Sequence, residues 1–144
     1  MNILFYFDEY HKDVWSGRNI DYDIWFVFQA IWGVKKLAVI DQCELDLTTI
    51  GRENIEIYNT LDEFLLGNDK ELFVLEHPRY PVDEMLDDHE FNEDAWYCIG
   101  PAEGWKNKNN YIGKTIGIEQ EGNGELHAPF VGSVLSYKYF MSKQ

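Results

Sequence analysis

Short apolar runs alternate with polar segments along the whole chain. The runs with the length of strands are residues 2–7, 35–40, 55–58, 71–76, 95–99 and 114–118. Most of them are almost wholly apolar, which is typical of strands that are covered on both faces of a sheet. The pattern therefore predicts a buried sheet.

Helical spacing appears between these runs. Apolar residues recur every three or four positions over 20–32, and Gly33 supplies a stop after them. Thr60 and Glu63 fit a capping box, which predicts a short helix over 61–66. Strands that alternate with helices in this way are typical of parallel sheets.

Two further helices are predicted in the second half of the chain. Val82, Met85 and Leu86 share one helical face. A last helix is expected to begin at Gly132 and its following serine and to run to Met141.

Together these elements predict an α/β fold, a mostly parallel sheet flanked by helices. The first strand, helix and second strand have the size of a βαβ unit, whose crossover is expected to be right-handed. No repeat, linker or low-complexity tract divides the sequence, so residues 1–144 are expected to form a single domain.

The apolar run over 95–99 stops abruptly in a turn that holds Gly100, Pro101 and Gly104. Glycine has no Cβ, so its backbone can approach a ligand closely. Ligands of open α/β sheets collect past the carboxyl ends of the strands. The turn is a candidate pocket floor, and the alternative is a tight surface turn without a ligand.

The composition indicates a globular, acidic protein. Hydrophobic residues make up 45% of the 144 positions, and the formal net charge is -14. A field of that sign repels nucleic acid on average, and the one hint of a basic patch is Lys106, Lys108 and Lys114. Three lysines in a polar loop are more often simply solvated.

The sequence also gives no sign of a disulfide framework, a metal site or a signal peptide. Cys43 and Cys98 are the two cysteines and indicate no disulfide framework. His89 stands in an acidic segment without a second histidine at metal-binding spacing, so no metal site is predicted. Residues 1–8 lack the pattern of a signal peptide or membrane span, so we expect a cytoplasmic protein that does not bind membranes.

Three stretches, in this order, resemble the SPOUT class of RNA methyltransferases, in particular its ribose 2'-O-methylating branch. Residues 17–20 (Gly-Arg-Asn-Ile) precede the first helix, as an Asn-Ile-Gly sequence does in that family. Residues 99–104 (Ile-Gly-Pro-Ala-Glu-Gly) are similar to the family's Gly-Pro-Glu-Gly-Gly turn, and residues 127–138 are similar to its last motif. Each motif is common turn material alone, and their joint order carries the resemblance.

The resemblance implies a C-terminal trefoil knot, a homodimer and S-adenosylmethionine held by loops after the strands that end near residues 76, 100 and 126. Backbone groups and apolar walls would grip the adenosyl group. The implied cofactor-binding residues are Leu75, Glu76, Gly100, Glu103, Gly104, Ala128, Pro129, Phe130, Val134, Leu135 and Ser136. Ser136 would either cap the last helix or hydrogen-bond the cofactor.

The resemblance also implies catalytic roles, with two departures. Asn19 would orient the acceptor, and Arg18 is a candidate for the place of the family's helix arginine, where this chain has Trp25. The asparagine of the family's last motif is matched with Lys138. Both departures remove groups that the family uses for chemistry.

Three functional hypotheses follow. The first is a methyltransferase that uses S-adenosylmethionine and acts on RNA, either tRNA or rRNA. The second is a catalytically degenerate SPOUT-like acidic protein that binds a basic partner or mimics nucleic acid, which the charge of -14, Trp25 and Lys138 favour. The third is an unrelated α/β domain with similar turns.

Overall fold

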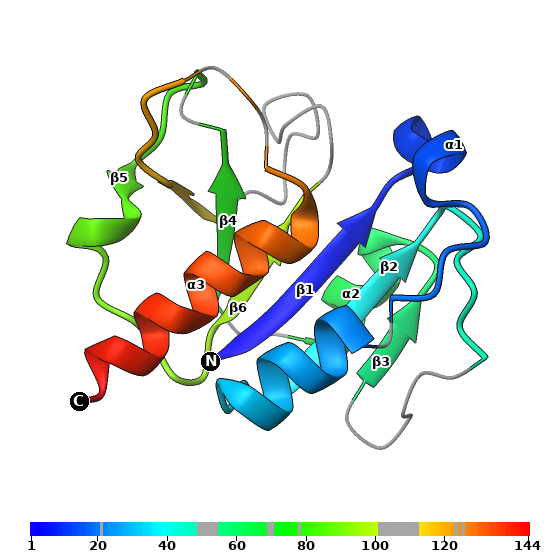
Figure 1. The fold of residues 1–144 in the computed structure, drawn as a ribbon, viewed down its shortest axis with the longest axis horizontal. Coiled ribbons are helices and arrows are strands. Elements are labelled where there is room, and N and C mark those ends of the chain that lie inside the picture. The colour runs from blue at the N-terminus through cyan, green and yellow to red at the C-terminus, as the bar shows by residue number, and fades with distance from the viewer. Residues whose placement is uncertain are drawn as a thin grey trace.

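The computed structural model describes residues 1–20, 22–48, 55–68, 71–77, 79–100, 113–122, 124 and 126–144 (Figure 1). The strands are β1 (Asn2–Phe7), β2 (Lys36–Asp41), β3 (Ile55–Tyr58), β4 (Leu72–Glu76), β5 (Glu84–Met85), β6 (Trp96–Ile99) and β7 (Lys114–Gly117). The helices are η1 (Glu9–His11), α1 (Lys12–Trp15), η2 (Tyr22–Ile31), α2 (Leu61–Gly67), η3 (Leu86–Asp88) and α3 (Ala128–Ser142).

All seven described strands pair in parallel in one sheet, in the order β3-β2-β1-β6-β4-β7-β5. β6 lies between β1 and β4, so Cys98 is aligned with Leu4 on one side and with Val74 on the other. The predicted α/β fold with a parallel sheet is therefore confirmed. The carboxyl ends of all seven strands lie at the same edge of the sheet.

The side chains of β1 alternate between two cores, as the period of a strand requires. Ile3 and Phe5 belong to the core under η2 and α3, whereas Leu4 belongs to the core on the α2 side. Figure 1 shows α3 and η2 side by side in front of the sheet and α2 behind it. The sheet is thus covered on both faces, which explains why its central strands are almost wholly apolar.

Both predicted helices of the first half are confirmed. η2 lies within the predicted segment 20–32. Its hydrogen bonds join residues five positions apart, one more than in an α-helix, as where the Trp32 amide donates to the Val27 carbonyl at 3.3 Å. In α2, the Thr60 hydroxyl accepts a hydrogen bond from the Glu63 amide at 3.1 Å. The predicted cap of this helix is therefore present.

The prediction for residues 82–86 is wrong. Glu84 and Met85 form the edge strand β5, which pairs with β7, and Leu86 begins the short turn η3. Asp83 fixes this edge, because its carboxylate accepts a hydrogen bond from the Thr115 amide at 2.8 Å. Pairing with a neighbouring strand therefore overrides the short helical spacing.

The last helix begins four residues earlier than predicted, at Ala128. Pro129 fits in the first turn because an amide there has no partner within the helix. Gly132 lies inside the helix, and a Cβ on it would lie 2.7 Å from Phe28 Cζ and 3.0 Å from Phe5 Cζ. The glycine therefore permits close packing of α3 on the sheet and on η2, and it does not start the helix.

The knot remains a prediction. It depends on how the chain runs between β6 and β7, and residues 101–112 lie outside the described residues. The strand order shows only that the chain crosses β4 between these two strands. No helix of the described part of the chain is long and apolar enough to cross a membrane.

The contact at Gly132 makes a prediction about stability. Alanine normally stabilises the interior of a helix by about 1 kcal/mol relative to glycine. Here we expect Gly132→Ala to lower the free energy of unfolding by about 1–3 kcal/mol, because the methyl group would displace two phenylalanine rings. Urea unfolding measures this difference.

The matched control is Ser133→Ala, at the next position of the same helix and only half-buried. It should change the free energy of unfolding by less than about 0.5 kcal/mol. A Gly132→Ala protein more stable than the wild type would contradict the packing described for α3.

Candidate functional site

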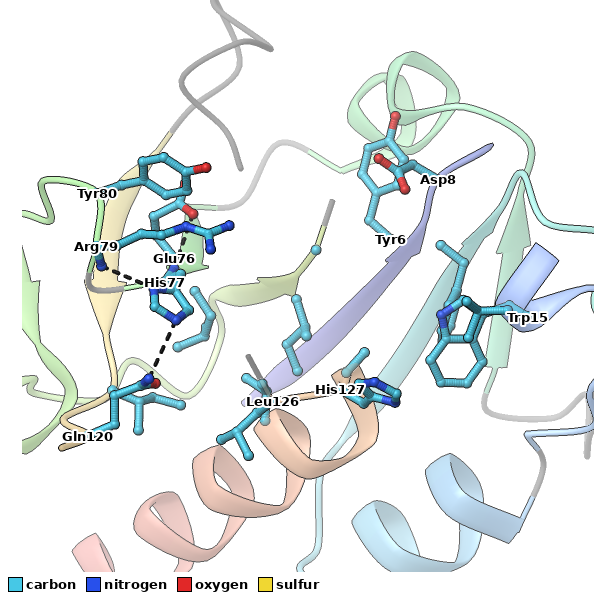
Figure 2. Close-up of a pocket in the computed structure, with 18 residues that line it drawn as sticks. Tyr6, Asp8, Trp15, Glu76, His77, Arg79, Tyr80, Gln120, Leu126 and His127 are labelled. Atoms are coloured by element: carbon cyan, nitrogen blue, oxygen red, sulfur yellow. Dashed lines mark hydrogen bonds between the residues drawn. The ribbon is translucent and has the colours of Figure 1, made fainter. Parts of the chain in front are cut away.

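A cavity of about 420 Å³ lies at the carboxyl-end edge of the sheet. Residues at or after the ends of β1, β4 and β6 form part of it, and the segment between β7 and α3 forms another part. Figure 2 shows their side chains converging on this space from several elements. The predicted site past the ends of the strands thus coincides with a real cavity.

The inner surface of the cavity is apolar. Leu75 of β4 and Ile99 of β6 contribute to it, together with Ile118, Leu126 and Val131. Such a surface suits the flat part of a small ligand and excludes water from it. Polar side chains also line the cavity, so a ligand would be oriented as well as buried.

Gly100 packs closely against the backbone of the neighbouring strand β1. Its φ angle is +92°, and a Cβ placed on it would lie 2.3 Å from the Tyr6 carbonyl oxygen. Only glycine fits a position that combines this conformation with this contact. The contact with β1 therefore accounts for this glycine, and its approach to a ligand stays a prediction.

A histidine ties two sides of the cavity together. His77 Nδ1 accepts a hydrogen bond from the Arg79 amide at 3.1 Å, so its other nitrogen carries the proton. That nitrogen lies 3.1 Å from the Gly124 carbonyl oxygen and donates to it. Gln120, which Figure 2 shows beside His77, donates to the same carbonyl at 2.8 Å. These bonds hold the segment before α3 against the end of β4.

Aromatic and cationic groups lie at the other side of the cavity. Trp15, the last residue of α1, contacts the rings of Phe7 and His127 with centroid distances of 5.0 and 6.0 Å. The Arg18 guanidinium lies 5.6 Å from the centre of the Trp15 ring, a cation–π distance. Sequence reasoning missed Trp15, and the only signal for it was an indole in a polar segment.

Two groups near the cavity have raised pKa values. Burial and the charge of Asp8 raise the pKa of Tyr6 above its usual value. Burial raises the pKa of the Cys98 thiol as well. Neither side chain is therefore a base or a nucleophile near neutral pH, and Cys98 packs in the α2-side core.

The structure separates the predicted cofactor-binding residues into three groups. Those that line the cavity are Leu75, Glu76, Gly100 and Ala128. Those that do not are Pro129, Phe130, Val134, Leu135 and Ser136. Glu103 and Gly104 lie outside the described residues. The cofactor-binding role of all of them stays a prediction.

The early start of α3 explains the second group. Ala128 and Val131 are the helix residues that line the cavity, and later positions lie farther along the helix. Leu135 and Ser136 are fully buried, and Ser136 Oγ has no hydrogen-bond partner among the described residues. Ser136 therefore neither caps the helix nor faces the cavity.

The predicted catalytic residues lie beside the cavity and do not line it. Asn19 pairs with Asp46 in an isolated parallel bridge, and the Arg18 carbonyl accepts from the Asp46 amide at 2.9 Å. Lys138 lies ten positions after the start of α3 and forms an ion pair with Asp87 at 2.7 Å. Trp25 belongs to η2, and its side chain lies outside the described residues.

No metal site emerges from the described residues, because no three histidine, cysteine or acidic side chains converge among them. The charged groups that line the cavity are Asp8, Glu76 and Arg79, which come from different segments. The cavity therefore presents both apolar and polar groups to any ligand.

No protein-family model and no curated protein matches this sequence. Solved structures do match it. A protein from work on the 2-OH methylation of C/U34 on tRNA is 14% identical, has a TM-score of 0.66, and aligns over 100% of this chain and 98% of its own.

Two other solved structures contain AdoMet. The SpoU methyltransferase AviRb from Streptomyces viridochromogenes is 12% identical with a TM-score of 0.64, and an rRNA methyltransferase from Sinorhizobium meliloti is 10% identical with a TM-score of 0.58. Each alignment covers 99% of this chain but only 60% and 57% of those proteins. The non-sequential strand order and these similarities place this chain in the fold of the SPOUT-class RNA methyltransferases.

Proposed function

We propose that this protein is an S-adenosylmethionine-dependent methyltransferase that acts on RNA, either tRNA or rRNA. The observation that carries the proposal is the cavity at the ends of β1, β4 and β6 in a fold whose similar structures include AdoMet complexes. This is the edge at which open α/β sheets bind their ligands.

The residues of the cavity fit the cofactor. The apolar surface of Leu75, Ile99 and Val131 suits the adenosyl group, and Gly100 lies at the edge of the same surface. Asp8 and Glu76 are carboxylates that favour a cationic sulfonium nearby. The cavity therefore combines the two kinds of surface that this ligand requires.

S-adenosylmethionine supplies an electrophilic methyl group when it is bound. The chain's own residues contribute position and exclusion of water, which account for much of the rate in such transfers. Leu75 and Ile99 exclude water, whereas His77 and Gln120 fix the segment before α3 so that Ala128 faces the cavity. The rim with Trp15 and Arg18 is where we place the RNA acceptor.

We also propose a homodimer formed through α3. Phe130, Tyr137 and Met141 are about half exposed or more, and their spacing of seven and four puts them on one face of the helix. An exposed apolar stripe of this kind marks an interaction surface. A second copy of the chain would cover it.

The second candidate function is an acidic protein that binds a basic partner or mimics nucleic acid. The net charge of -14 favours it, because such a field attracts basic proteins and repels RNA. Affinity capture from lysate separates the candidates: a basic protein released by salt supports this function, and bound RNA supports methyl transfer.

Calorimetric titration with S-adenosylmethionine tests the proposed function. We expect saturable binding to the wild type and at least about 10-fold weaker binding to Ala128→Trp, because the indole would occupy the cavity. Lys138→Trp is the control on the exposed part of the same helix, away from the cavity lining, and should bind like the wild type. No heat from the wild type at millimolar ligand would contradict the proposal.

The hydrogen bonds of His77 predict a second effect on affinity. His77→Ala removes the bonds to the Gly124 carbonyl and the Arg79 amide, which frees the segment before α3. We expect about 10-fold weaker binding of S-adenosylmethionine, the effect of roughly one hydrogen bond. Glu121→Gln, an exposed change in the same segment, should leave the affinity unaltered. Equal affinities for all three proteins would show that this segment does not shape the site.

A further inference from the structure

His127 stands apart from the other histidine rings that the structure describes. It precedes the first residue of α3, lines the cavity and is exposed. Its ring contacts the Trp15 indole edge to face, at 6.0 Å and 62°. Neither ring nitrogen is hydrogen-bonded to any described residue, and the side chain does not cap the helix.

The other two described rings are fully engaged. His77 accepts from the Arg79 amide and donates to the Gly124 carbonyl, so neither of its nitrogens is open. His89 lies 2.5 Å from a carboxylate oxygen of Glu84 through Nδ1 and 2.6 Å from the Tyr97 hydroxyl through Nε2. Its side chain is only 3% exposed. Neither ring can take a proton from a ligand without breaking an existing bond.

The remaining polar groups of the cavity are less suited to accepting a proton from a ligand. Tyr6 keeps its proton, because burial and Asp8 raise its pKa. Arginine has no accepting atom, which excludes Arg79. The carboxylates Asp8 and Glu76 are weaker bases than a neutral imidazole, which is best matched to proton transfer near pH 7.

We propose that His127 is the group that takes the proton from the acceptor hydroxyl in this reaction. This proposal rests on the proposed function. As the hydroxyl oxygen bonds to the methyl carbon, the carbon–sulfur bond breaks and its electron pair stays on sulfur. The hydroxyl proton moves to an unprotonated ring nitrogen of His127, so charge and atoms balance. A hydroxyl needs such a base because it is a weak nucleophile while it holds its proton.

Neighbouring groups orient the imidazole and set its electrostatic surroundings. The Trp15 indole contacts the His127 ring, and the Arg18 guanidinium lies 5.6 Å from the centre of the same indole. The charged groups that line the same cavity are Asp8 after β1, Glu76 at the end of β4 and Arg79 beyond it. The imidazole is thus fixed beside the acceptor end of the cavity and remains open to the ligand.

Single-turnover methyl transfer to unmodified tRNA and rRNA transcripts, with tritiated S-adenosylmethionine, tests the proposal. We expect His127→Asn to slow transfer by about 100-fold or more, the usual contribution of a general base. Asparagine is a good residue at the start of a helix, so this variant should fold. Glu121→Asn, which introduces the same residue at an exposed position in the segment before α3, should keep the wild-type rate.

The pH profile separates proton transfer from a structural role. The wild-type rate should rise with pH, because only a neutral imidazole accepts a proton. His127→Asn should lose this rise, and added imidazole should partly restore transfer by His127→Gly. An unchanged profile and rate in His127→Asn would overturn the proposal.

Binding measurements distinguish failure of this inference from failure of the proposed function. Calorimetry with S-adenosylmethionine and anisotropy with labelled tRNA transcripts should give wild-type affinities for His127→Asn, within about 3-fold. The NMR signals of the His127 ring should shift when the transcripts are added. No cofactor binding by the wild type would reject the proposed function, whereas cofactor binding with unmoved His127 signals would reject only this inference.

Discussion

The insertion of β6 between β1 and β4 is the constraint on which the rest of the structure depends. It brings Ile99 and Gly100 between the ends of two strands that are far apart in the sequence. The next strand, β7, lies beyond β4, so the chain must cross that strand twice before α3 packs back near β1. Every side of the cavity follows from this arrangement, because each comes from a segment that leaves the same edge of the sheet.

Gly132 makes the return of α3 possible. The helix crosses the sheet so closely that the rings of Phe5 and Phe28 occupy the place of a side chain. That approach buries Leu135 and Ser136 and points Ala128 and Val131 at the cavity. The close packing at Gly132 therefore helps to set which end of the helix faces the cavity.

Much of the fold could be predicted from the sequence because its strands are short apolar runs and its first helix has clear spacing. The cap at Thr60 could also be predicted, because its hydrogen bond joins residues only three positions apart. The sequence predicts the start of α3 four residues too late, because Gly132 looks like a start signal although it lies inside the helix, where it permits close packing. Pairing with β7 likewise makes residues 84–85 a strand, and the local sequence does not indicate this partner.

The candidate site was predictable in part for the same reason. The turn at Gly100 carries its own signal, whereas the hydrogen bonds of His77 to Gly124 join segments 47 positions apart. Trp15 and His127 meet only in three dimensions, across more than a hundred residues. Lys138, which the motif suggested as a departure from the family, instead pairs with Asp87 on the surface.

We propose that the cavity at the carboxyl ends of β1, β4 and β6 holds S-adenosylmethionine. A crystal structure of the protein grown with this cofactor would show whether it does. We expect electron density for the adenosyl group against Leu75, Ile99 and Ala128, with the sulfonium toward the Trp15 side. A cavity closed by side chains, or cofactor density elsewhere on the protein, would contradict it.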